Sequence, residues 1–109
     1  EPRLLASGTA SIVGHVSKHV GDVAEQLRES LRNLDALMAQ AAEKCGHAFR
    51  PEGCEALRVY LRRPSDLASA QAVLAGSGIP ASRISYLRGD ICRRELDVEL
   101  EGVFAPSAA

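Results

Sequence analysis

The sequence predicts one α+β domain, a sheet with two helices on one of its faces. Apolar residues recur at helical spacing over two stretches and alternate with polar residues over others. Glycine and proline separate these stretches and give the order β-α-β-α-β-β. A length of 109 residues suits one such domain with one core.

The first half of the chain predicts a short strand and a long helix. The stretch "RLLASGTAS" is typical of a strand, with Gly8 where the backbone approaches a neighbour closely. Residues 12–22 are expected to be a connection. Asp22 is the predicted N-cap, with Glu25 three residues later, and Gly46 ends the helix. One apolar stripe follows the helix: Val23, Leu27, Leu31, Leu34, Met38 and Ala41.

The second half predicts a loop, a strand, a shorter helix and two more strands. The ranges are 47–54 for the loop "HAFRPEGC", 55–63 for a strand that Pro64 stops, 65–78 for a helix closed by Gly76 and Gly78, 79–92 for a strand broken or bent at Gly89-Asp90, and a last strand over the end of 89–102.

The composition excludes several classes. The net charge is −1 and no basic run is long, so a nucleic-acid footprint is not evident. No apolar stretch approaches the roughly 20 residues that span a bilayer. Three cysteines, an odd count without paired spacing, favour reduced thiols and a cytoplasmic setting. Of the 13 basic residues 11 are arginine, which suits an anionic ligand or reflects a GC-rich genome.

The chain begins abruptly at "EPRLLASGTAS", which is already strand-like. We therefore expect it to be part of a longer protein, so that the absence of a targeting segment carries little weight.

The last predicted strand has one apolar face and one acidic face. Its acidic residues are Glu95, Asp97, Glu99 and Glu101, and Leu96, Val98 and Leu100 lie between them. On the strand over 55–63, Leu57, Val59 and Leu61 share one face and Arg58, Tyr60 and Arg62 the other. Arginine and carboxylate side chains could pair across the sheet, and we expect Glu101, Asp97 and Glu95 to pair with arginines such as Arg58 or Arg62. The polar face is either a solvated surface or an interface that holds a site.

Three groups of residues could carry chemistry. A carboxylate of the acidic strand is a general acid only if burial or like charge raises its pKa, and alternating glutamates are common on solvated faces. Cys92 is a nucleophile only beside a base, and otherwise an ordinary half-buried thiol. His15, His19, Cys45 and His47 could contribute to a zinc site, but hydrogen-bonded loop histidines fit the spacing better. We expect no metal.

The motifs resemble a known family. The element order, with "ASGTAS", "PASR" and "VELEG", is similar to the RidA (YjgF) superfold, whose members are trimers with sites between subunits. The longer stretches "SGTASIVGHVSKHVGD" and "YLRGDICRRELDVELEGVF" resemble the C-terminal domain of chorismatases. Such chains are also labelled pteridine-dependent dioxygenase-like. The resemblance extends from Leu5 to Phe104.

The resemblance implies a fold, an activity and site residues. Residues 1–109 would be the RidA/YjgF-like C-terminal domain of a longer chorismatase, whose upstream N-terminal domain completes the site. Chorismate would yield pyruvate plus 3-hydroxybenzoate or a dihydroxycyclohexadiene carboxylate, without a cofactor. Glu99 would protonate the enolpyruvyl group. Cys92 lies seven residues earlier, and a cysteine at this position is typical of the family members that form 3-hydroxybenzoate. Gly8 and Arg83 would bind substrate, although Arg83 is one residue further from Glu99 than in RidA proteins.

Two alternatives remain from other classes. One is a RidA-like imine or enamine deaminase, which needs an arginine such as Arg83 for the substrate carboxylate. The other is a non-catalytic trimeric ligand-binding module. As an isolated domain, the chain is expected to form a homotrimer and to turn over chorismate poorly.

Overall fold

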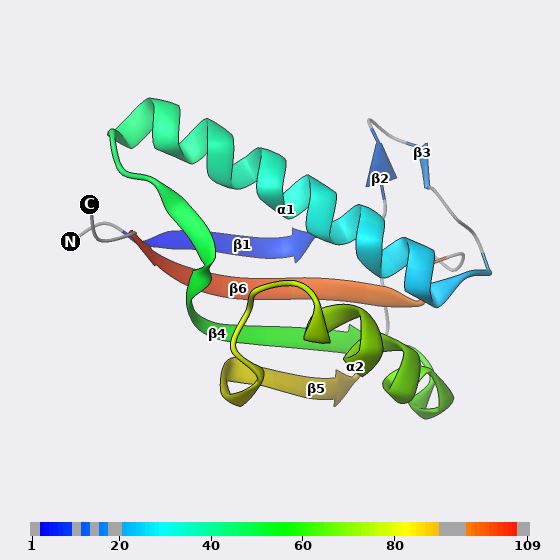
Figure 1. Cartoon of the computed structure of the whole chain (residues 1–109). Helices are drawn as coiled ribbons and strands as arrows, with labels where there is room; N and C mark the ends of the chain where they lie inside the picture. The colour runs from blue at the N-terminus through cyan, green and yellow to red at the C-terminus, as the bar shows by residue number, and fades with distance from the viewer. Residues whose placement is uncertain (1–2, 10–11, 14–15, 18–20, 90–95, 107–109) are drawn as a thin grey trace.

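Two helices lie against one face of a four-stranded sheet (Figure 1). The structure is a computed structural model that describes residues 3–9, 12–13, 16–17, 21–89 and 96–106. In chain order its elements are β1 (Leu4–Thr9), β2 (Ile12–Val13), β3 (Val16–Ser17), α1 (Val23–Cys45), β4 (Phe49–Leu61), the 3-10 helix η1 (Pro64–Asp66), α2 (Leu67–Ala75), the 3-10 helix η2 (Ala81–Arg83), β5 (Ile84–Arg88) and β6 (Val98–Pro106). The predicted α+β class and element order are confirmed. The connection expected over residues 12–22 contains the β2–β3 hairpin as an addition.

The sheet order is β1-β6-β4-β5. Strand β6 is antiparallel to both of its neighbours, whereas β4 and β5 are parallel and are joined through α2, as a parallel pair requires a crossover. The acidic strand β6 therefore lies inside the sheet, with backbone partners on both sides.

Helix α1 has the predicted ends. The carboxylate oxygen Oδ1 of Asp22 accepts a hydrogen bond from the N–H of Glu25 at 3.1 Å. Gly46 has a φ of 73°, a left-handed conformation that favours glycine, and its N–H donates to the carbonyl oxygen of Ala42 at 3.0 Å. The predicted stripe faces the sheet: Leu27, Leu34 and Met38 are buried, and Val23, Leu31 and Ala41 pack partly buried against the core.

Strand β4 begins earlier than predicted. The loop expected over residues 47–54 is wrong from Phe49 onward, because this stretch pairs with β6. The pairing is irregular, with register shifts on either side of Cys54, and such bulges accommodate proline and glycine inside a strand. At Gly53 an added Cβ would lie 2.7 Å from the carbonyl oxygen of Ala105, so the close approach of the two backbones requires glycine.

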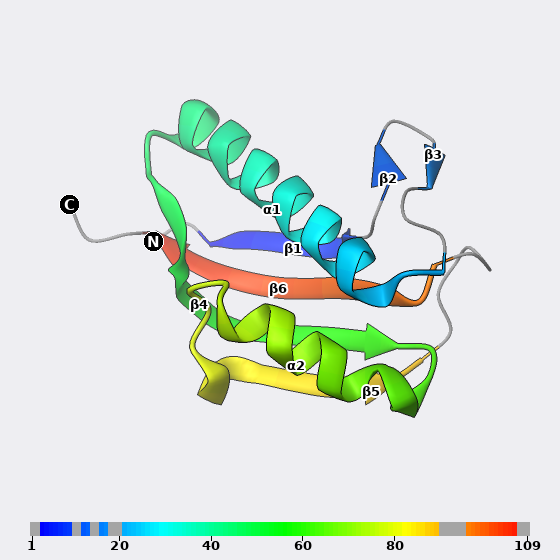
Figure 2. The same ribbon diagram turned by 45° about the vertical axis from the view of Figure 1, so that its right-hand side comes forward.

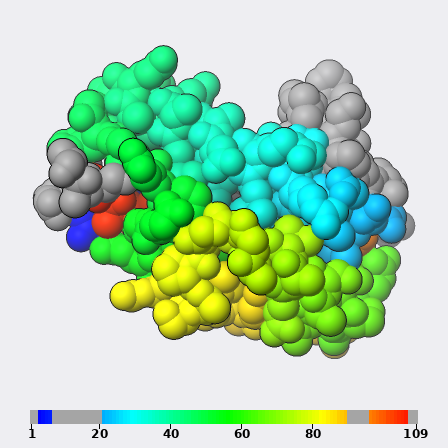
Figure 3. All heavy atoms as spheres, viewed as in Figure 1, coloured from blue at the N-terminus to red at the C-terminus, as the bar shows by residue number. Residues whose placement is uncertain are grey.

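The core lies between the helices and the sheet. Strands β4 and β6 supply alternate residues to it: Leu57, Val59, Leu61, Val98, Leu100 and Phe104. Figure 2 shows α1 over β1 and β6 and α2 over β4 and β5, and Figure 3 shows that their side chains hide most of the sheet from this side. The described residues place no helix on the opposite face of the sheet. No helix in the described ranges is long and apolar enough to cross a membrane.

Candidate active site

The uncovered side of the sheet, here called the open face, carries Arg58 and Tyr60 of β4 and Glu99, Glu101 and Val103 of β6. Tyr60 is opposite Glu99 in the register, and Arg58 is opposite Glu101. The intervening residues of both strands are buried in the core. The predicted split of each strand into an apolar face and a polar face is therefore confirmed for these residues.

Glu101 is held in its ionised form by β4. Nη1 of Arg58 donates to Oε1 of Glu101 at 2.8 Å, and the hydroxyl of Tyr60 donates to the same oxygen at 3.2 Å. The hydrogen bond from Arg58, with that from Tyr60, lowers the pKa of Glu101 below its ordinary value of 4.5. The predicted Arg58–Glu101 pair across the sheet is confirmed. Because both side chains are exposed, the pair affects local charge more than stability.

Glu99 lies in a different environment on the same face. Its side chain is half-buried, and within the described part of the chain no hydrogen bond or ion pair to its carboxyl group is found. Burial, and after it the charge of Glu101, raises the pKa of Glu99 above 4.5. The pKa values of these two carboxyl groups, two residues apart, are therefore shifted in opposite directions. In many active sites such a difference distinguishes the general acid from a charged neighbour.

Asp97 was expected on the same polar face, paired with Arg58 or Arg62, and this expectation is wrong. Asp97 precedes β6, is only 5% exposed, and its Oδ1 accepts from Nη1 of Arg63 at 2.6 Å. The residues on both sides of it, Leu96 and Val98, are also buried. The regular alternation of buried and exposed side chains begins only at Val98. The direction in which the Asp97 side chain points is therefore determined by its contacts with other elements.

Arg83 is exposed and distant from Glu99 within one chain. The next residue, Ile84, is opposite Leu57, whereas Glu99 is opposite Tyr60 on the other side of β4. Three residues along the strands and two strand spacings across give about 14 Å between the Cα atoms of Ile84 and Glu99. The two residues do not meet in a single copy of the domain.

Gly8 lies in β1 where the pairing with β6 shifts register, between Ala6 and Thr9. This position is close to Glu99 along the sheet, because Thr9 is opposite Leu100. An irregularity beside the predicted acid is compatible with the expected substrate-binding role, which stays a prediction.

Cys92 lies outside the described residues, as do Glu95, His15 and His19. Cys45 is exposed, and its thiol donates to the carbonyl oxygen of Ala41 at 2.9 Å. Among the described residues, no group of three or more histidine, cysteine, aspartate and glutamate side chains could hold a metal ion.

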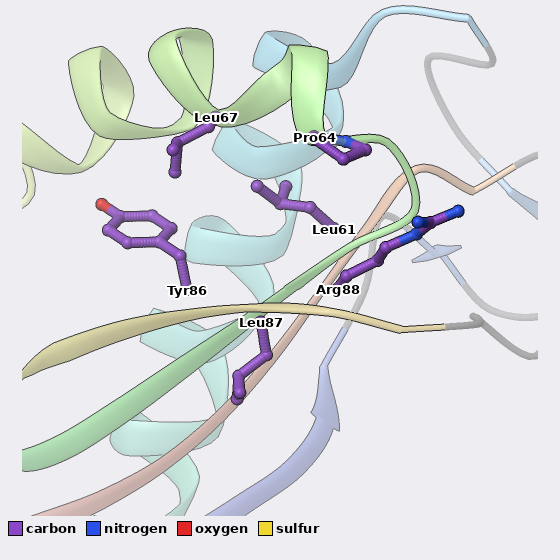
Figure 4. A pocket seen from close by; sticks show the side chains of 6 residues that line it. All are labelled: Leu61, Pro64, Leu67, Tyr86, Leu87 and Arg88. Atoms are coloured by element: carbon purple, nitrogen blue, oxygen red, sulfur yellow. The ribbon is translucent and has the colours of Figure 1, made fainter.

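A small pocket lies on the other side of the sheet from these carboxylates. It has a volume of about 160 Å³ and is formed by Leu61, Pro64, Leu67, Tyr86, Leu87 and Arg88. Figure 4 shows Tyr86 and Leu67 converging on it, with Leu87 on the opposite side of β5. The lining is mostly apolar, so the pocket is poorly suited to a polyanionic substrate.

Two polar contributions to this region were not predicted from the sequence. Tyr60 was placed on the polar face but not recognised as a partner of Glu101. Gln26 is fully buried and bonds Asp97. The available signal was the position of Gln26 and Ser30, four residues apart and within the apolar stripe of α1.

No protein-family model matches the chain. Among curated proteins, a 3-hydroxybenzoate synthase from Streptomyces hygroscopicus is 36% identical over 105 residues, which are 93% of this chain and 31% of the relative. A chorismatase from Streptomyces rapamycinicus is 37% identical over 108 residues, 94% of this chain and 32% of the relative.

A protein of the same name is also similar to this chain in its three-dimensional structure. A chorismatase determined by crystallography superimposes with a TM-score of 0.86 at 34% identity, over 94% of this chain and 32% of that one. The chain is a homologue of the chorismatases. It spans about a third of the length of the curated relatives it matches. The fold of this chorismatase homologue is also that of a YjgF-family protein from Neisseria meningitidis, with a TM-score of 0.74 at 21% identity over 98% of this chain and 82% of that one.

Proposed function

We propose that this chorismatase homologue supplies the general acid for the cleavage of chorismate, and that the acid is Glu99. The proposal rests on the opposite pKa shifts of two carboxyl groups on one face of β6. Arg58 and Tyr60 hold Glu101 ionised, whereas burial and the charge of Glu101 raise the pKa of Glu99. A general acid needs a pKa near the operating pH. The similarity to chorismatases supports the choice of substrate.

The chemistry required of Glu99 is one proton transfer to carbon. Chorismate carries an enolpyruvyl ether, and protonation of its methylene carbon leaves a cation on the ether carbon and a carboxylate on Glu99. Water or a ring hydroxyl then bonds to the cationic carbon, and the proton released returns to the carboxylate. After capture by water, the bond from that carbon to the ether oxygen breaks as the ketone of pyruvate forms, and the ether oxygen stays on the ring as a hydroxyl. After capture by the ring hydroxyl, two bonds of the cyclic ketal break. The ether oxygen stays on the ring and takes up the proton lost from its ring carbon, and the oxygen of the former hydroxyl leaves its ring carbon to become the ketone oxygen of pyruvate.

The product depends on which nucleophile bonds to the cation. Capture by water gives a dihydroxycyclohexadiene carboxylate, and one water is consumed. The route to 3-hydroxybenzoate consumes no net water. The relative named 3-hydroxybenzoate synthase and the sequence spacing of Cys92, seven residues before Glu99, favour the second route. In this proposal the thiol affects the choice of product and is not a nucleophile.

The substrate clamp is proposed to extend beyond one copy of this domain. Chorismate is a dianion that arginine side chains can bind in a bidentate manner, but Arg58 is engaged by Glu101 and Arg83 is distant from Glu99. The open face also exposes Leu5, 70% accessible and opposite Val103 in the register. Cover by an upstream domain or by further copies, as in a trimer, would bury this side chain and add cations to those that the described residues supply. The offset of Arg83, which lies one residue further from Glu99 along the sequence than in RidA proteins, counts against a RidA-like deaminase.

The test compares Glu99→Gln with Glu101→Gln in the full-length protein, with pyruvate release from chorismate as the readout. Glutamine keeps the shape and hydrogen bonding of glutamate but cannot protonate carbon. Glu99→Gln should lower kcat by about 100-fold to 10,000-fold, with KM changed by less than about threefold because the substitution leaves binding contacts in place. The matched Glu101→Gln variant should lower kcat far less than Glu99→Gln does.

Two outcomes would contradict the proposal. If the Glu101 variant loses activity and the Glu99 variant retains it, Glu101 is the acid. If the wild-type protein releases no pyruvate from chorismate, the substrate is wrong. A reaction in D₂O adds an independent check, because proton transfer to the methylene carbon should place one deuterium in the methyl group of pyruvate.

A further inference from the structure

A buried polar cluster joins the first turns of α1 to the start of β6, two residues before Glu99. Gln26 is fully buried and Asp97 is 5% exposed. Oε1 of Gln26 accepts a hydrogen bond from the N–H of Asp97 at 2.7 Å, and its Nε2 donates to Oδ2 of Asp97 at 3.3 Å. One glutamine side chain therefore bonds both the backbone and the side chain of Asp97.

The two residues that follow β4, Arg62 and Arg63, hold the same short segment from another direction. Nη1 of Arg63 donates to Oδ1 of Asp97 at 2.6 Å. Nε of Arg62 donates to the carbonyl oxygen of Leu96 at 3.0 Å, and the N–H of Arg62 donates to that of Asp97 at 3.1 Å. Residues 96–97 are thus anchored to α1 and to β4 by directional contacts.

Stability alone does not account for this arrangement. Burying a carboxylate carries a desolvation cost, and replacing buried ionic groups with apolar ones is often neutral or stabilising. A buried hydrogen-bond network in which each polar group has a partner instead favours one specific geometry. Leu96, Asp97 and Val98 are buried in succession. Apolar packing alone therefore does not determine at which residue the alternation of buried and exposed side chains along β6 begins. The hydrogen bonds of Asp97 define it.

We propose that Gln26 and Asp97 are positioning residues for Glu99, which hold the start of β6 so that the Glu99 carboxyl group meets the reacting carbon. The inference rests on the proposed function of Glu99. Neither residue touches the substrate in this scheme. Their effect is transmitted through Val98, the one residue that separates Asp97 from Glu99.

The chain allows a swap of the two polar groups. In Gln26→Glu, two carboxylates face each other. In Asp97→Asn, the new amide can keep its oxygen on Arg63 only by turning its NH₂ towards the NH₂ of Gln26. In the double variant, that NH₂ donates to the new carboxylate, while the N–H of residue 97 keeps its acceptor. The net charge is unchanged, so the double variant tests geometry.

The experiment uses the full-length protein with both single variants, the double variant and Ser30→Ala. The control Ser30 is also buried on α1, but its hydroxyl donates its hydrogen bond to the carbonyl oxygen of Gln26 and not to Asp97. The readouts are kcat and KM for pyruvate release well below the melting temperature, the melting temperature, and the NMR titration of the Glu99 carboxyl group, assigned with Glu99→Gln.

Each single variant should lower kcat by about 10-fold to 100-fold, the order that a displacement of about 1 Å can cause. KM should change by less than about twofold, and the titration of Glu99 should move. The double variant should recover most of kcat and the wild-type titration. Ser30→Ala should lower only the melting temperature.

The inference is overturned if both single variants melt at lower temperature with unchanged kcat and unchanged Glu99 titration, as Ser30→Ala should. If the wild-type protein does not act on chorismate, the proposed function fails, and the titration alone still decides whether the pair positions Glu99. Should a single variant not fold, Arg63→Gln replaces it, because Arg63 is largely exposed and its side chain is 57% accessible. A folded Arg63→Gln protein without change in kcat or titration would also overturn the inference.

Discussion

Replacing Gly102 with alanine should destabilise the protein, because the strand that carries Glu99 leaves no space for a methyl group there. Gly102 is opposite Ala6 of β1 and Leu57 of β4. An added Cβ would lie 3.0 Å from Cε1 of Phe104 and 3.1 Å from Cδ1 of Leu57. Both neighbours are almost completely buried, so neither can move out into solvent.

The expected magnitude follows from these contacts. Forcing an extra methyl group into a well-packed core costs about 1–3 kcal/mol. For a domain of this size, 1 kcal/mol lowers the melting temperature by about 4 °C. Gly102→Ala should therefore lower the melting temperature by about 4–12 °C, in a thermal unfolding experiment followed by circular dichroism.

Gly76→Ala is the matched control. Gly76 caps α2 with a negative φ of −98°, and the nearest atom to an added Cβ is the carbonyl oxygen of Val73 at 3.9 Å. This variant should match the wild type or exceed it slightly, because alanine restricts the unfolded chain. If Gly102→Ala is as stable as Gly76→Ala, the packing of β6 against β4 described here is wrong.

Three further outcomes are expected. Asp22→Ala should cost about 1 kcal/mol of helix capping in denaturant unfolding, whereas Asp35→Ala, on the exposed side of α1, should have little effect. The folded protein favours protonated Glu99, so its ionisation costs stability once the pH exceeds 4.5, the ordinary value. The stability of Glu99→Gln relative to wild type should thus increase as pH rises through 4.5 and level off above the raised pKa, and a constant difference from pH 3 to pH 8 would contradict the raised value. Cys92→Ala should alter the ratio of products from chorismate more than the rate of pyruvate release, and complete loss of pyruvate by a folded variant would instead indicate covalent catalysis.

Local signals in the sequence were sufficient for most of the fold. Asp22 and Gly46 mark the ends of α1 because capping depends on a few adjacent residues. The alternation of leucine and valine with charged residues assigned Glu99 and Glu101 to one face, since side chains of a strand point alternately to its two sides. The first part of β4 was missed because Pro51 and Gly53 are typical of loops, and only the bulged pairing with β6 accommodates them in a strand.

The resemblance to chorismatases singled out Glu99, but the physical cause of the chemical difference between the two carboxylates lies in the tertiary structure. Glu99 and Glu101 have the same side chain on the same face of the same strand, and the sequence assigns both to an acidic row. Arg58 and Tyr60 reach Glu101 from a strand about forty residues earlier, and Gln26 turns Asp97 towards α1 from 71 residues away. Periodicity determines which way a side chain points, because it depends on local backbone geometry. The partner that sets its charge depends on which strands and helices become neighbours, and only the folded chain determines that.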